Sequence, residues 1–177
     1  KAADTLGISL TLSAGRPFPG RAGIERSFSD AMEGLKHRLV AGRRSFIRHW
    51  EQATSTQSDR DPAVELHRIL NALKLGSEEK TQDALKDYFA RLHTRSNGYY
   101  EATQAINLLL AGTIEYLMEE HQDPADVFGD GVHPYERLAS LETLSDVESW
   151  FSGVFNSIIA EQDISHLSNQ RYLLRLT

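Results

Sequence analysis

The sequence predicts a mainly α-helical protein, with a small β-α-β piece at the N-terminus followed by a bundle or array of about five helices. Strict alternation of apolar and polar residues, which is typical of a strand, is clear only in the first dozen residues. From residue 61 onward, apolar residues instead recur at steps of three and four. A chain of 177 residues makes one domain, or a domain plus a fragment of another. The stretch 51–60 is polar and has no periodic pattern, so it is interpreted as a linker between residues 1–50 and 61–177.

The N-terminal part is expected to contain two strands joined by a helix. The first strand, Thr5–Leu12, places one apolar face toward a core, and its partners are expected elsewhere in the chain or outside it. A Gly/Pro-rich turn, 15–23, leads into a helix that should stop at Gly42, and a short strand is expected over 45–50. The helix has an apolar stripe wide enough to cover a sheet, formed by Ile24, Phe28, Met32 (or Ala31), Leu35 and Leu39.

The remainder is expected to be helical, with start and stop signals at most boundaries. The third helix of this part is apolar almost all round, which favours a central, enclosed position. Between 123 and 134 a turn-rich connection is expected, anchored by Val127 and Phe128, and a separate helix is expected to begin within Leu167–Thr177. The predicted helices run from Asp61-Pro62 to Gly76, from Ser77 to beyond Leu92, from Tyr99 to His121, from Tyr135 to Leu141, and from the capping pair Thr143 and Asp146 past Ile159.

Composition narrows the classes of function. The chain has no cysteine, which excludes disulfides, thiolate metal sites and cysteine nucleophiles. With 19 basic and 25 acidic side chains, its net charge of −6 makes it a poor binder of nucleic-acid backbones by itself. Apolar runs fall short of the roughly 20 residues that span a bilayer, so we expect a cytoplasmic protein without membrane contact from this segment. Because the first residue is Lys1, a piece of a longer protein is expected.

Side chains that could bind a metal ion gather near the end of the long helix. They are Glu119, Glu120, His121 and Asp123, with His133 near Asp126 and Asp130. A helical metal site needs ligands three or four residues apart on one face, and the helix is expected to end before Asp123 can contribute. An EF-hand loop starting at Asp126 would need oxygen ligands at positions occupied by Phe128 and Arg137. We therefore predict a solvated helix end and no metal.

No motif for nucleophilic catalysis or nucleotide binding is recognisable either. Gly7-Ile8-Ser9 lacks the second glycine and the following helix of a serine elbow. The turn 15–23 lies between a strand and a helix, but its glycine spacing matches no phosphate-binding pattern. We predict no catalytic residue and no cofactor.

Two further sets of residues have open interpretations. A basic cluster is more typical of a solvated exterior or a docking surface than of a nucleic-acid site, and comprises Lys36, His37, Arg38, Arg43, Arg44, Arg48 and His49. Four aromatic residues could line a small-molecule pocket, although core packing is the more common role of aromatics at helical spacing: Tyr99, Tyr100, Trp150 and Phe155.

The order of these segments resembles a known family. The strand TLGISLTLS (5–13) followed by the segment 23–49 is similar to the closing strand and last helix of a GGDEF-like fold, in the degenerate form found in the middle of AraC-type regulators, many of them two-component response regulators. The similarity continues through 62–92, 104–120, 123–129 and 138–159. No GGDEF signature is present, so no cyclase residue is carried over to any position.

The resemblance implies a regulatory middle module without catalytic activity. Such a module relays a signal from a receiver or sensor upstream to a DNA-binding domain outside this chain, and self-associates as a homodimer. A small-molecule effector-binding helical domain is the alternative. An enzyme fragment that retains nucleotide affinity is a third interpretation.

Overall fold

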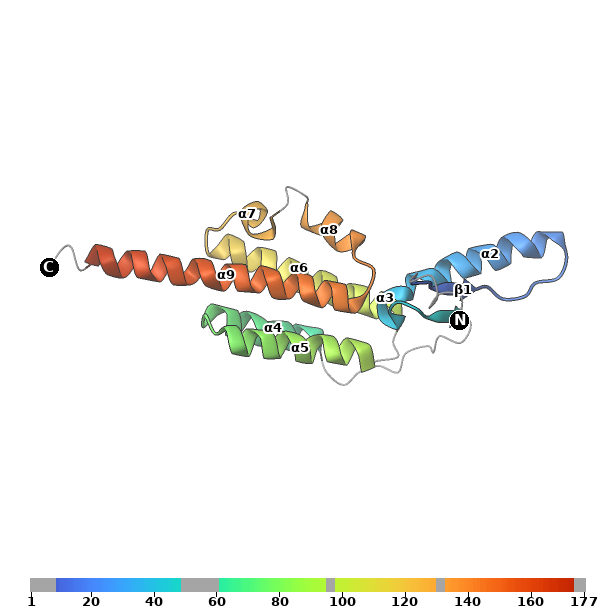
Figure 1. Ribbon diagram of the computed structural model, residues 1–177, viewed down its shortest axis with the longest axis horizontal. Coiled ribbons are helices and arrows are strands. Elements are labelled where there is room, and N and C mark those ends of the chain that lie inside the picture. The colour runs from blue at the N-terminus through green and yellow to red at the C-terminus, as the bar shows by residue number, and fades with distance from the viewer. Residues whose placement is uncertain (1–8, 49–60, 95–97, 130–132, 174–177) are drawn as a thin grey trace.

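The computed structural model describes residues 9–48, 61–94, 98–129 and 133–173 (Figure 1). It confirms a mainly helical protein with a small two-stranded sheet near the N-terminus. We call residues 9–48 the N-terminal unit and the described residues from 61 onward the helical bundle. The molecule is elongated, with the N-terminal unit at one end and the C-terminal end of the last helix at the other (Figure 1). The predicted linker 51–60 lies outside the described residues.

The N-terminal unit is a parallel β-α-β arrangement. Strand β1 (Leu12–Ala14) pairs with β2 (Phe46–Arg48), and helices α2 (Arg21–Lys36) and α3 (Arg38–Ala41) connect them. The second strand confirms the expectation for 46–48 but not for Ser45, and His49 and Trp50 lie outside the described residues. The first strand was placed too early, because residues 9–11 are not in a strand and 5–8 are not described. The helical segment ends at Gly42, as predicted, where φ is 78°.

Helix α2 packs on the sheet with its small residues, and the prediction for its large apolar stripe was wrong. A Cβ atom on Gly15 would lie 1.8 Å from the carbonyl oxygen of Ser27, so backbone meets backbone where β1 leads into α2. Gly23 and Gly34 are buried on this side. Such a close approach leaves no room for large side chains between the helix and the sheet. The first three residues of the stripe face solvent instead, since Ile24, Phe28 and Met32 are 70, 66 and 50% exposed, whereas Leu39 packs against the bundle core.

The bundle begins with a hairpin of α4 (Pro62–Lys74) and α5 (Glu78–Thr94). The Asp61 carboxylate accepts the Ala63 N–H at 3.0 Å, which caps the first turn as predicted. Gly76, with φ of 62°, forms the turn between the two helices. Arg68 pairs with Asp87 at 3.0 Å on the exposed side of the hairpin.

Helix α6 (Tyr99–Glu119) forms the middle of the core but is not enclosed on all sides. Leu109, Leu110 and Leu117 are fully buried, whereas Met118 is 65% exposed, so the prediction of an all-round buried helix was wrong. Gly112 allows α4 to approach, because a Cβ atom there would lie 2.8 Å from Leu66 Cδ2. These contacts place α6 against α4 along one face.

The predicted connection after α6 contains a further helix, α7 (Pro124–Phe128). Asp123 caps α7 by accepting the Ala125 N–H at 2.9 Å, and the anchors Val127 and Phe128 are buried as expected. Helix α8 (Pro134–Ser140) follows and agrees with the predicted short helix. Sequence periodicity does not predict α7, because five residues are too few to show a periodic pattern.

Helix α9 (Leu144–Leu173) is continuous, so the predicted separate helix within Leu167–Thr177 was wrong for the described part. Its 30 residues make a rod of about 45 Å. Phe151, Phe155 and Ile158 are fully buried against the bundle. The first half of α9 therefore belongs to the core.

A polar cluster sets the register between α5 and α9. The Gln82 side-chain amide donates to Asn156 Oδ1 at 2.6 Å, and Ser152 Oγ donates to Gln82 Oε1 at 2.7 Å. Because these groups are directional, sliding α9 along α5 would leave them without partners. The position of α9 along the bundle is therefore specified as well as stabilised.

Adjacent leucines of α6 test where the core lies. Replacing Leu109 (0% exposed) with alanine should lower the free energy of unfolding by about 2–5 kcal/mol, because it leaves a cavity. The matched change at Leu108 (37% exposed) should cost less than about 1 kcal/mol. Urea unfolding followed by circular dichroism measures both. Equal losses would show that α6 is rotated from the position described.

Candidate functional site

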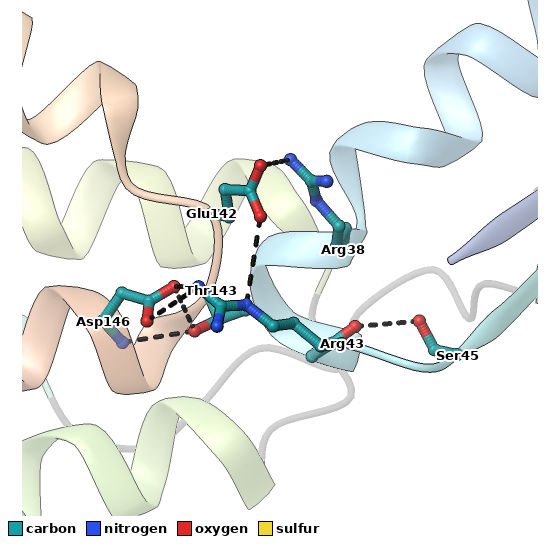
Figure 2. A network of polar contacts seen from close by, with 7 residues as sticks. Arg38, Arg43, Ser45, Glu142, Thr143 and Asp146 are labelled. Carbon is teal, nitrogen blue, oxygen red and sulfur yellow. Dashed lines mark hydrogen bonds and ion pairs between the residues drawn. The ribbon is translucent and has the colours of Figure 1, made fainter. Parts of the chain in front are cut away.

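The N-terminal unit meets the bundle at the beginning of α9. Arg43 donates from Nη2 to both carboxylate oxygens of Asp146, at 3.2 and 3.1 Å. Arg38 Nη2 lies 2.9 Å from Glu142 Oε1, and Arg43 Nε lies 3.9 Å from Glu142 Oε2. Figure 2 shows these side chains converging from α3 and its following loop on one side and from the start of α9 on the other. We call this group of four residues the joint.

Local backbone geometry explains why Arg43 reaches Asp146. Gly42 has φ of 78° and its N–H donates to the Arg38 carbonyl at 2.8 Å, so α3 ends sharply. The Ser45 hydroxyl then donates to the Gly42 carbonyl at 2.9 Å and closes the turn (Figure 2). Arg44 has φ of 61°, which is uncommon for a residue other than glycine. The turn holds Arg43 toward α9.

Asp146 has a second role, in capping α9. Its N–H donates to Thr143 Oγ1 at 3.2 Å, and the Thr143 hydroxyl donates to Asp146 Oδ2 at 2.8 Å. The predicted cap is therefore present, with the carboxylate bound to the hydroxyl and to Arg43 (Figure 2). A negative charge in the first turn also interacts favourably with the helix dipole. The joint is thus connected directly to the start of α9.

The joint is specific in geometry but weak in energy. The side chains of Arg43 and Asp146 are 56 and 29% exposed, and those of Arg38 and Glu142 are 37 and 46% exposed. Pairs in such positions contribute about 0–1 kcal/mol each. The apolar part of the contact comes from Leu39 and Val40, which pack against the bundle core.

Polar contacts also link α2 to α6. The Tyr100 hydroxyl donates to the Glu33 carboxylate, and Lys36 Nζ lies 2.7 Å from the same residue. The hydrogen bond that Tyr100 donates to Glu33 raises the pKa of Tyr100. A second hydrogen bond to Glu33, from Lys36, raises the pKa of Lys36. The Glu33 carboxylate thus favours the protonated form of both groups.

A cavity of about 380 Å³ lies beside the joint, in the range typical of small-molecule sites. We call it the joint cavity. Residues from α2, α3, α6, α8 and the start of α9 contribute to its walls, among them Leu39, Tyr99, Tyr135, Leu138 and Glu142.

The four aromatic residues predicted as a pocket have different surroundings. Tyr99 lines the joint cavity, whereas Tyr100 is 61% exposed and bonded to Glu33. Trp150 packs against Phe128, with ring centroids 5.5 Å apart, and Phe155 is fully buried. The pocket formed by all four stays a prediction, and Tyr99 is the member that borders the cavity described here.

Sequence reasoning identified Arg38, Arg43 and Asp146 without pairing them, and it missed Glu142. Arg38 and Arg43 belong to the basic cluster that was interpreted as solvated or as a docking surface, and Asp146 was identified as a cap. Arg43 and Asp146 are 103 residues apart, and no local pattern connects residues at that separation. The arginines form a docking surface within the chain.

The described residues contain no group of three or more histidine, cysteine, aspartate or glutamate side chains placed to hold a metal ion. Among those same residues, none of the helices combines the length and apolarity needed to cross a membrane.

Burial raises the pKa of Tyr116, with a further contribution from Glu120, so its phenol is a weaker acid than usual.

Neighbouring arginines test the joint. Arg43→Gln should lower the free energy of unfolding by about 1 kcal/mol or less at low salt, because it removes a partly exposed ion pair. Near 1 M salt the loss should largely disappear, since screening shortens the reach of such charges to about 3 Å. Arg44→Gln is the matched control and should change little under either condition. Urea unfolding at both salt concentrations measures this; a salt-independent loss for Arg43→Gln would argue against an electrostatic joint.

Comparison with known proteins relates this chain to a curated bacterial protein. No protein-family model matches the chain, and no solved structure matches it. The chain is 25% identical over 158 residues to the uncharacterized HTH-type transcriptional regulator YtdP of Bacillus subtilis (strain 168). The match covers 88% of this chain and 20% of that protein, so the chain spans about a fifth of the length of its relative. Over most of its length, this chain is distantly similar to one part of an HTH-type transcriptional regulator.

Proposed function

We propose that this chain is a non-catalytic signal-relay region of an AraC-type transcriptional regulator that acts in the cytoplasm. DNA is bound by a helix-turn-helix domain outside this chain. The support from comparison is the similarity to a transcriptional regulator, which covers nearly the whole chain and a small part of the relative. A region of that kind transmits information between domains and carries out no reaction.

The observation that carries the proposal is the path of α9. Its first turn is bound to the N-terminal unit through Arg43 and Asp146, its middle is buried in the bundle, and its C-terminal end reaches the far end of the molecule (Figure 1). A continuous helix is stiff over this length, so α9 joins the contact with the N-terminal unit to the far end of the molecule through one element. This is the arrangement a relay requires.

The weakness of the joint also supports a relay. A switch needs two arrangements that differ by only a few kcal/mol. Partly exposed ion pairs of about 0–1 kcal/mol can be exchanged for others at low cost, whereas the buried core of the bundle cannot. Movement of the N-terminal unit relative to the bundle would therefore break the joint first.

The N-terminal unit is the proposed input side. In this proposal, residues 1–50 are the C-terminal portion of a degenerate GGDEF-like unit, 61–177 are the helical relay domain, and a receiver domain or sensor lies upstream, as in a two-component response regulator. The parallel β-α-β arrangement supports the first assignment. The exposed stripe of Ile24, Phe28 and Met32 is an apolar surface such as adjoining protein normally covers.

Self-association completes the proposal. A homodimer would hold two DNA readers at a fixed separation, and a change in the angle of α9 would alter their spacing over two half-sites. The second candidate function, a small-molecule effector-binding domain, is favoured by the joint cavity and its lining residue Tyr99.

Sedimentation equilibrium of the 177-residue chain tests self-association. We expect a monomer–dimer equilibrium at micromolar concentration, which corresponds to about 8 kcal/mol of association free energy. Phe28→Ser provides a comparison, because weakened association would place the exposed stripe in the interface. A chain that stays monomeric at millimolar concentration would contradict the dimer.

Charge exchange at the joint tests the relay. In the regulator that contains this segment, Arg43→Asp should disrupt the response of a transcriptional reporter to its input, because two carboxylates then face each other. Combining it with Asp146→Arg should restore part of the response by re-forming the pair in reverse. Arg44→Asp, on the next residue, is the control for a change of charge alone. A reporter response that is unchanged by Arg43→Asp would exclude the joint as the relay.

A further inference from the structure

We propose that the joint cavity binds a small organic anion, with an apolar or aromatic body and one carboxylate. This inference deepens the proposed function and rests on it in one respect: the cavity lies beside the joint, so its ligand would regulate the relay. Binding itself can be measured without reference to transcription.

The cavity lies where both parts of the molecule meet. Lys36 and Leu39 line it from the N-terminal unit, Tyr99 and Ile106 from α6, and Tyr135 from α8. A ligand inside would therefore touch the N-terminal unit and the bundle at the same time. Its volume of about 380 Å³ suits a molecule at the small end of the range that protein pockets hold.

The inner walls are apolar and the rim is exposed. Ile106 and Val147 belong to the buried core, and Leu39 and Leu138 pack against it. Tyr135 also lines the cavity and is 45% exposed, so the cavity opens to solvent beside it. An apolar or aromatic body fits against the inner walls, because its burial removes apolar surface from water.

Two cationic side chains, Lys36 and Arg38, line the cavity beside a single carboxylate, Glu142. Lys36 and Arg38 line the cavity and can only donate, with three and five N–H groups respectively. Glu142, an acceptor that lines the cavity, has one oxygen facing Arg38 and the other facing Arg43. Lys36 has a described ion pair with Glu33, which uses one of its three donors. A carboxylate on the ligand would complement the excess positive charge at the rim through charge-assisted hydrogen bonds.

Occupancy would bias the relay by a simple mechanism. The ligand touches both parts only when the N-terminal unit is docked on the bundle, so it binds the docked arrangement better than an open one. A ligand shifts such an equilibrium by its difference in affinity for the two states. The anion would therefore hold the joint closed.

Isothermal titration of the 177-residue chain with two matched probes tests the proposal. The probes are 1-naphthoate and its neutral counterpart 1-naphthalenemethanol, which have the same ring system. We expect 1-naphthoate to bind with one site per chain and about tenfold more tightly than the neutral probe, from charge-assisted hydrogen bonds. Absence of heat with 1-naphthoate at millimolar concentration at two well-separated temperatures would overturn the proposal, as would equal affinity for both probes.

Variants locate the binding site. Ala139→Trp fills the cavity from α8 and should abolish binding, whereas Ala111→Trp, at an exposed position of α6 outside the lining, should leave it unchanged. Arg38→Gln should weaken 1-naphthoate about tenfold and leave the neutral probe unaffected. Arg137→Gln, on α8 but outside the lining, is its control. Thermal unfolding of each variant confirms that it is folded, and binding that survives Ala139→Trp in a folded chain would place the site elsewhere.

The outcomes separate the cavity from the relay. Binding together with an unaltered reporter response in Arg43→Asp would leave the cavity established and remove the relay. A disrupted reporter response without any binding of 1-naphthoate would support the relay and refute the ligand.

Discussion

Packing of α9 against the other long helices is the contact on which the rest of the structure depends. Phe151 and Phe155 anchor it in the core, and the hydrogen bonds among Gln82, Ser152 and Asn156 fix its position along α5. The first turn of α9 is consequently held at a defined position beside α3. Without that registration, the carboxylates of the joint would have no defined place at which to meet the arginines.

The two kinds of contact differ greatly in strength. Each large apolar side chain in the core contributes about 1.5–3 kcal/mol through burial, and many such side chains act together. The joint contributes a few partly exposed ion pairs and a small apolar contact from α3. Local opening should therefore separate the N-terminal unit from the bundle well before the bundle itself unfolds. A rigid body attached through a weak contact is a suitable basis for a switch.

Local patterns predicted the bundle well, and failures occurred where distant parts of the chain decide the outcome. Leu66, Ile69 and Leu73 are buried in the core, as follows from their helical spacing, which already defines one face of α4. The orientation of α2 could not be predicted in this way, because it depends on how closely Gly15 approaches Ser27. The joint and its cavity were likewise beyond prediction, since they form only when α3 reaches α8 and α9.

The unbroken course of α9 has a consequence for how its two ends are related in angle. An α-helix turns by about 100° per residue, so the number of residues between its first and last turns fixes their relative orientation about the axis. Inserting or removing a single residue beyond the buried Ile159 would leave the core intact but swing everything attached downstream around the axis. Four residues bring it nearly back into line. The direction in which the C-terminal end of α9 faces is therefore set by the number of residues that separate it from the buried part of the helix.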